Sequence, residues 1–124
     1  MNVQKLNESI EVLKNNLGQS LVACDIFTTE DAQSIAGYNT QPVASALFCR
    51  ITNMMNESLA DSGFPTLGKF YLLDLANKFK VVVLPLGEYQ WGMLIDGTKI
   101  QLGLALNVAL PKAIKAFEEA AKSD

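Results

Sequence analysis

The sequence predicts an α+β domain: a five-stranded antiparallel sheet in the strand order 2-1-5-4-3, with helices on both faces. Three observations lead to this prediction. Apolar residues at helical spacing recur near the start, in the middle and near the end of the chain. Between them lie two groups of strand-like runs, a pair and a triplet, in which short turns join neighbouring strands. One run, Val81–Leu84, is apolar at every position, so both faces of the sheet need cover.

The first helix and the first hairpin follow from the spacing of apolar residues. A helix is expected over Val3–Leu17, and Gly18 ends it. Ser20–Phe27 is expected to be a strand that is apolar on both faces except at Asp25. The polar turn 28–31 joins it to a shorter strand over Gln33–Tyr38. The helical stripe consists of Val3, Leu6, Ile10, Leu13 and Leu17.

Start signals place the other two helices. Thr40-Gln41-Pro42 offers a capping hydroxyl followed by a proline in the first turn, and the helix is expected to run to about Ala60. Thr98–Gln101 matches a capping box and predicts a last helix that continues to about Ala121. Pro111 lies inside that helix, so we expect a kink there or a division into two helices.

Three strand-like runs follow the middle helix. They are Lys69–Leu75, Phe79–Leu86 and Gln90–Ile95, and the connections between them are short enough for hairpins. We therefore expect an antiparallel meander. Placing the first strand beside the last gives the order 2-1-5-4-3, which leaves Gln33–Tyr38 and Lys69–Leu75 as the two edges.

The Lys69–Leu75 edge is the feature from which we predict self-association. Its interior is apolar and contains neither proline nor glycine, although soluble proteins usually protect such edges from other strands. The preceding helix also carries more apolar residues than one sheet contact requires. A twofold dimer would bury both, whereas a monomer in which this strand is central is the alternative. The expected interface comprises Lys69, Phe70, Tyr71, Leu72, Leu73, Leu47, Ile51 and Met54.

Composition and targeting signals exclude several classes of protein. The 124 residues, expected to form a single domain over 1–124, carry a net charge of −3, whereas nucleic-acid binding normally needs excess positive charge. The start of the chain lacks the apolar core of a secretion signal. The uncharged stretch Ile100–Pro111 is too short to span a bilayer, so we expect a cytoplasmic protein without membrane insertion. Cys24 and Cys49 are far apart, each in an apolar stretch, and are expected to be buried free thiols.

The sequence contains no pattern that indicates catalysis. It has no histidine, which removes the commonest general base and metal ligand, and it has no phosphate-binding glycine motif. Asp25, Asp31 and Asp96 are better explained as turn-stabilising or strand-ending residues than as a Mg²⁺ cluster. We expect no enzyme activity, cofactor or metal. Arg50 and Met55 are candidate partner-binding residues, with a solvent-facing arginine and a packing methionine as the alternatives.

Three stretches resemble the roadblock family, the dynein light-chain roadblock type and its bacterial relatives, which include gliding-motility GTPase regulators. They are Ser20–Asp25, Ser34–Tyr38 and Ile100–Ala105, and the similarity covers most of the chain. One departure is Ala32, which stands where the family often has a turn glycine. The resemblance implies a homodimer or a heterodimer with a paralogue, joined through the third strands, and a helical face that binds partners. It also implies a regulator of Ras-like GTPases that acts without an arginine finger, or a motor or signalling scaffold.

Two functional hypotheses follow. The leading one is a non-catalytic dimeric interaction module that binds or regulates a small Ras-like GTPase or scaffolds a motor or signalling complex. The alternative is a small-molecule sensor with an apolar pocket between sheet and helices. The small residues Gly92, Gly103, Ala105 and Ala109 are the sequence features that suggest space for such a ligand.

Overall fold

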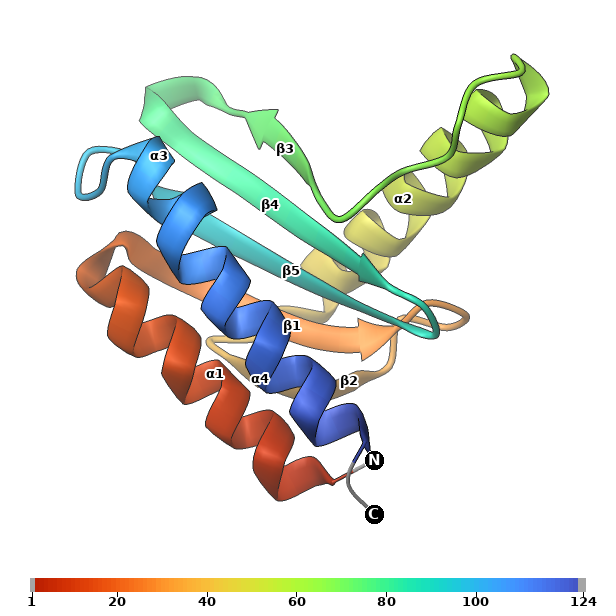
Figure 1. The fold of residues 1–124 in the computed structure, drawn as a ribbon. Helices are drawn as coiled ribbons and strands as arrows, with labels where there is room; N and C mark the ends of the chain where they lie inside the picture. Colours follow the sequence, from red (N-terminus) through yellow and green to blue (C-terminus); the bar gives the residue numbers. More distant parts are fainter. Residues whose placement is uncertain (1, 123–124) are drawn as a thin grey trace.

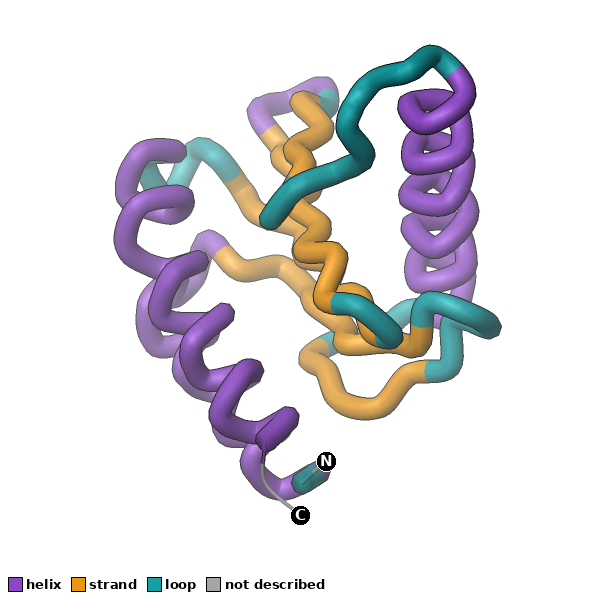
Figure 2. Tube along the Cα trace, turned by 45° about the vertical axis from the view of Figure 1, so that its right-hand side comes forward, coloured by secondary structure: helices purple, strands orange, loops and turns teal. Residues whose placement is uncertain are grey.

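The computed structural model describes residues 2–122, which form three layers (Figure 1). Helix α1 (Val3–Leu17) and helix α4 (Leu110–Lys122) lie side by side on one face of a sheet. Helix α2 (Pro42–Asp61) lies alone on the other face, as the view in Figure 2 shows. Both faces of the sheet are thus covered, as the all-apolar central run predicted.

The sheet has five antiparallel strands in the order β2-β1-β5-β4-β3, which confirms the predicted fold class and strand order. The two edges are β2 and β3. Two short 3-10 turns, η1 and η2, precede β1 and β4. The bounds are β1 Leu21–Thr28, β2 Ser34–Tyr38, β3 Tyr71–Asp74, β4 Phe79–Leu86, β5 Tyr89–Asp96, η1 Gly18–Ser20 and η2 Ala76–Lys78.

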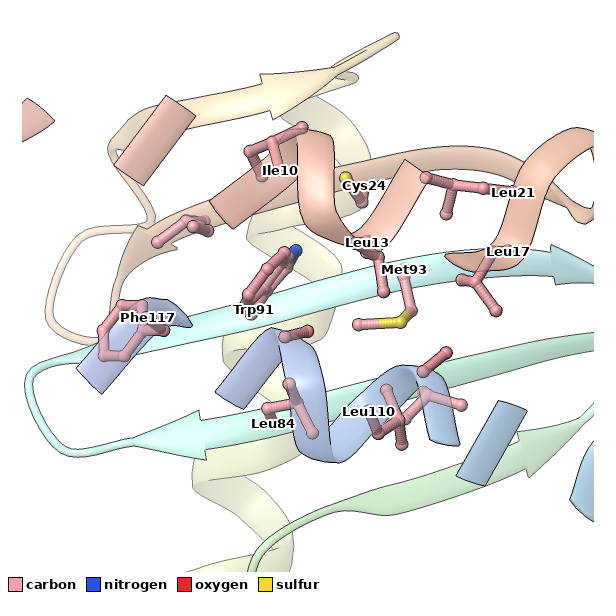
Figure 3. Close-up of a cluster of buried hydrophobic side chains, with 14 of the residues drawn as sticks. Ile10, Leu13, Leu17, Leu21, Cys24, Leu84, Trp91, Met93, Leu110 and Phe117 are labelled. Atoms are coloured by element: carbon pink, nitrogen blue, oxygen red, sulfur yellow. The ribbon is translucent and has the colours of Figure 1, made fainter. Parts of the chain in front are cut away.

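The main core lies between the sheet and the α1/α4 layer (Figure 3). The predicted stripe of α1 supplies four of its five residues to this core, whereas Val3 is 52% exposed. Trp91 and Phe117 lie among the buried side chains from β5 and α4. Gly18 ends α1 with a φ of 58°, a backbone conformation that favours glycine.

The edge strand β3 is shorter than the predicted run Lys69–Leu75. Its register pairs Tyr71 with Val83, so an extension would place Lys69 opposite Pro85. The N–H of Leu75 donates to the carbonyl of Phe79, which makes alternate residues of β3, including position 69, those that would bond to β4. Because Pro85 has no N–H to donate, the ladder stops at Tyr71. Lys69 and Phe70 therefore precede the strand.

Neither predicted hydroxyl cap is formed. The residue before α2 is Gln41, whose side chain makes no capping bond, so Thr40 lies one position too early. Thr98 donates its N–H and its hydroxyl to Asp96 Oδ1, at 2.9 and 2.6 Å, and thereby completes a turn after β5. The last helical segment begins only at Leu102. In both cases the hydroxyl belongs to the preceding loop.

Pro111 does not divide the last helix into two, and the distortion beside it is a π-helical turn. The chain passes from α3 (Leu102–Leu104) through a π-helical turn, η3 (Ala105–Ala109), into α4 without a break (Figure 1). In this turn the N–H of Leu110 donates to the carbonyl of Ala105. Proline cannot supply the next N–H, and the wider turn shifts the hydrogen-bonding pattern just before it. Ala105 and Ala109 are buried in the main core, so they allow close helix packing instead of leaving space.

Candidate interaction surface

Helix α2 is fastened to the sheet by polar contacts. Its buried residues are Ser45, Cys49 and Thr52. The Ser45 hydroxyl donates to the Asp25 carboxylate, and Cys49 Sγ donates to the carbonyl of Thr29 at 2.9 Å. Further along, the Thr52 hydroxyl lies 2.8 Å from the hydroxyl of Tyr71. Phe48, Ile51 and Met55 pack on the sheet beside these polar residues, whereas the large apolar residues Val43, Leu47 and Met54 remain outside.

Asp25 is a tether within the sheet and not a strand-ending residue. It lies inside β1, is buried, and accepts hydrogen bonds from Ser34 on β2, at 2.5 Å, and from Ser45 on α2. Burial raises the pKa of this carboxyl above its usual value, and the two serine hydrogen bonds oppose the rise. One side chain thus ties three elements together at the first turn of α2.

The outward face of α2 is apolar and accessible. Val43 is 83% exposed, Leu47 46% and Met54 56%, whereas Ile51 is half-buried because it packs against the cluster of Tyr71, Val81 and Val83. A helix on the surface of a soluble monomer normally directs such residues inward. This exposed apolar face therefore indicates a docking surface for another protein.

The edge strand β3 adds a second binding element beside α2. Tyr71, Leu73 and Leu75 direct their backbone groups to β4, as the Leu75–Phe79 hydrogen bond shows. The N–H and carbonyl groups of Leu72 and Asp74 consequently point away from the sheet. Within residues 2–122, no strand lies on that side of β3. Two residues of backbone are thus presented for pairing with another strand.

The structure brings most of the predicted interface residues to one edge of the molecule. Leu72 and Leu73 lie in β3, and Leu47, Ile51 and Met54 lie on α2. Lys69 and Phe70 stand just before the strand, Phe70 with 42% of its surface exposed, and the Tyr71 side chain is buried against Thr52. Of the two partner-binding candidates, Arg50 is exposed, whereas Met55 packs partly beneath the helix against Tyr71, Val81 and Val83.

A cleft of about 270 Å³ separates the N-terminal half of α2 from the sheet. Its lining is almost entirely apolar and includes Leu47 and Phe48 of α2, and Leu75, Val81 and Leu94. Gly92 forms part of the floor. A Cβ built there would lie 2.8 Å from the Phe48 ring, so only glycine allows this ring to rest on β5.

The cysteines and the other two predicted turn aspartates have structural positions. Cys24 and Cys49 are buried free thiols, as predicted, and burial raises the pKa of Cys24 to about 11, which keeps it protonated at neutral pH. Asp31 accepts from the Thr28 hydroxyl in the first hairpin, and Asp96 caps the turn after β5. Among residues 2–122 no three histidine, cysteine, aspartate or glutamate side chains cluster as metal ligands.

Sequence reasoning missed two parts of this surface. One is the hydrogen bond between Asp25 and Ser45. Asp25 was visible as the single acidic residue in an otherwise apolar strand, but no pattern distinguished Ser45. The cleft itself agrees with the alternative hypothesis of an apolar pocket between sheet and helices, and of the four small residues named for it only Gly92 lines the cleft. Phe64, in the loop after α2, is 63% exposed, and nothing in the sequence marked it.

No family model and no curated protein matches the chain, whereas solved structures do. MglB of Myxococcus xanthus superposes with a TM-score of 0.74 at 15% identity, over 98% of this chain and 93% of MglB. A structure of MglB with a tetrameric arrangement gives 0.74 at 12% identity, over 95% and 91%. A roadblock/LC7 domain from Streptomyces avermitilis gives 0.66 at 8% identity, over 94% and 98%.

The chain has the roadblock fold. The agreement spans nearly the whole chain and nearly the whole of each neighbour, so the resemblance seen in three sequence stretches is confirmed at the level of the fold. At these identities the roadblock fold by itself does not determine a function. No helix among the described residues has the length and apolar character needed to cross a bilayer.

Proposed function

We propose that this chain is a non-catalytic interaction module that forms a twofold dimer through β3 and α2 and uses the outer face of α2 to bind or regulate a small Ras-like GTPase. In this dimer the two copies contact each other through the expected interface, which comprises residues 69–73 with Leu47, Ile51 and Met54. Arg50 is then assigned to the bound partner, whereas Met55, the other candidate, packs against the sheet and is left out of this contact. The second copy is either this chain or a paralogue.

One observation carries the dimer: an unpaired edge strand lies beside a helix whose apolar side chains are exposed. Leu72 and Asp74 present backbone groups outward, and Leu47 and Met54 present apolar surface on the same molecule. Edge-to-edge pairing around a twofold axis satisfies both, because it extends the sheet and brings the two helices together. Exposed apolar surface of this kind marks sites of protein association.

The assignment of a GTPase as the partner rests on the roadblock resemblance and on the chemistry of α2. Arg50 stands on the exposed side of an apolar helix, and arginine in such surroundings is enriched among residues that dominate binding energy. The chain would act by binding one conformation of the GTPase more tightly than another, and would supply no group to the reaction.

Two measurements test the proposal. Sedimentation velocity at micromolar concentration should show a dimer, and a monomer would contradict it. Purified chain should then capture a Ras-like GTPase from a lysate of the source organism in a manner that depends on added GDP or non-hydrolysable GTP. Arg50→Glu should abolish this capture, and Lys115→Glu, on α4, should preserve it. Equal capture by both variants would remove Arg50 from the contact, and no capture in any nucleotide state would refute the GTPase assignment.

A further inference from the structure

The C-terminal part of α2 extends past the edge of the sheet. Contacts along the helix follow the strands in order: Ser45 bonds to β1, Phe48 rests on β5 and Thr52 meets Tyr71 of the edge strand β3. Met55 is the last residue of α2 that packs against the buried cluster of Tyr71, Val81 and Val83 on the sheet. From Asn56 onward the helix contacts its own following loop, as when Asn56 Oδ1 accepts from the N–H of Leu67. We call residues 56–64 the overhang.

The tip of the overhang is fixed in shape and carries an exposed aromatic ring. Gly63 N–H donates to Ala60, and Phe64 N–H donates to Leu59, at 3.1 and 2.9 Å. With Gly63 at a φ of 79°, these bonds form a Schellman motif, in which the residues at the positions of Leu59 and Phe64 commonly touch. Phe64 nevertheless keeps 63% of its surface exposed. A preorganised, exposed aromatic residue is typical of an interface anchor.

The geometry of the edge fixes where a second overhang would arrive. The outward-facing residues Leu72 and Asp74 can bond only to outward-facing residues of another copy, so the pairing of greatest overlap sets Leu72 opposite Asp74. The same register sets Tyr71 of each copy opposite Leu75 of the other, on the same face of the sheet. Since α2 leaves its own sheet beside Tyr71, the helix of the second copy enters beside Leu75.

Distances agree with this placement. Tyr71 and Leu75 are four residues apart, about 13 Å along a strand, which accommodates two neighbouring helices at the usual 8–10 Å. From Met55 to the end of α2 the helix rises about 9 Å, or about two strand spacings. The overhang of one copy therefore reaches across β3 to β4 of the other copy. Leu75 and Val81, on that path, form one side of the apolar cleft.

We propose that the cleft between α2 and the sheet is completed by a second copy of this chain, whose Phe64, supported by Leu59, is inserted into it. This inference rests on the dimer proposed above and specifies its occupant. Leu47 and Leu75, at the rim of the cleft, are 46% and 42% exposed. A small ligand inside the cleft would leave this rim in water, whereas a protein partner would cover it, so the rim favours a protein segment as the occupant. By symmetry the two clefts are filled reciprocally.

Isotope-coded photocross-linking tests the inference. Phe64 is replaced by p-benzoyl-phenylalanine in the full chain, and ¹⁴N and ¹⁵N preparations are mixed, irradiated and digested. Mixed-isotope peptides that join position 64 to residues 73–81 or 92–94 are the expected result. If the protein is a dimer but position 64 cross-links only within its own chain or to other segments, the inference is wrong while the proposed dimer stands. A monomer in sedimentation would refute both.

Matched charge variants provide a second readout. Phe64→Glu should raise the dissociation constant of the dimer about tenfold or more, as expected for an aromatic anchor. Leu104→Glu places the same charge at a residue that is 51% exposed in the α3 segment on the other face, and should change it less than about twofold. Circular dichroism verifies that both variants fold. Equal effects, or a small molecule retained by the dimer in native mass spectrometry and bound in the cleft, would overturn the inference.

Discussion

Replacing Asp74 by proline should weaken the dimer while leaving the monomer folded. The N–H of Asp74 points away from β4, so proline removes no hydrogen bond of the monomer. In the proposed register this N–H donates to Leu72 of the second copy, and symmetry makes it two bonds per dimer. At about 1 kcal/mol for each bond, the loss is about 2 kcal/mol, or about 30-fold in the dissociation constant.

Asp74→Ala is the matched control for this substitution. It removes the same carboxylate and its exposed ion pair with Lys80, but it keeps the backbone N–H. An exposed pair contributes little, so we expect a dissociation constant within about threefold of the parent value. Sedimentation velocity over a concentration series measures both variants. If proline and alanine have equal effects, or if proline leaves association unchanged, β3 does not pair with a second copy in this register.

Four further predictions concern stability and are read from urea denaturation. Gln90→Met should raise the free energy of unfolding by about 1–2 kcal/mol, because in the described residues neither polar atom of this buried side chain has a hydrogen-bond partner; a loss would show that the amide is satisfied. Ala32→Gly should stabilise by about 0.5–1 kcal/mol, since Ala32 has a φ of 58°, and no gain would mean that the turn is not strained. Gly92→Ala should cost about 1–3 kcal/mol by displacing Phe48, and a neutral effect would mean that the ring moves freely. Folding raises the pKa of Asp25, so the folded state binds more protons than the unfolded state, and the free energy of unfolding should fall as pH rises from about 3.8 through the folded pKa. Asp25→Asn should flatten this dependence. An unchanged pH profile would mean that the pKa of Asp25 is not raised by folding.

The fold could be predicted because its determinants are local or cumulative. The stripe of α1 and the all-apolar run Val81–Leu84 each specify their own burial, and short connections then leave few ways to arrange five strands. The length of β3 could not be predicted in this way. It depends on Pro85, which lies in a different strand and acts only through the register that places it opposite Lys69.

The starts of the helices also depend on contacts that the local sequence does not reveal. Thr40 and Thr98 have the side chain that a helix cap requires, and each stands near a helix start. A nearby carboxylate, Asp96, binds Thr98 more favourably than the helix end does, since the two groups are only two residues apart. A pattern of residue types does not rank such competing hydrogen bonds; the folded geometry does.

The sequence did not determine which residues of α2 face outward, and Met55 shows why. Sequence periodicity identifies an apolar helix, but it does not say which of its sides is inside. The inner side proved to be mixed: Ser45 and Thr52 have partners in Asp25 and Tyr71 that lie far away in the sequence, and Phe48, Ile51 and Met55 pack on the sheet beside them. Those distant polar contacts turn Leu47 outward and Met55 inward. Leu47 and Met54 stay outside, and they are two of the residues that we assign to the proposed contact between copies.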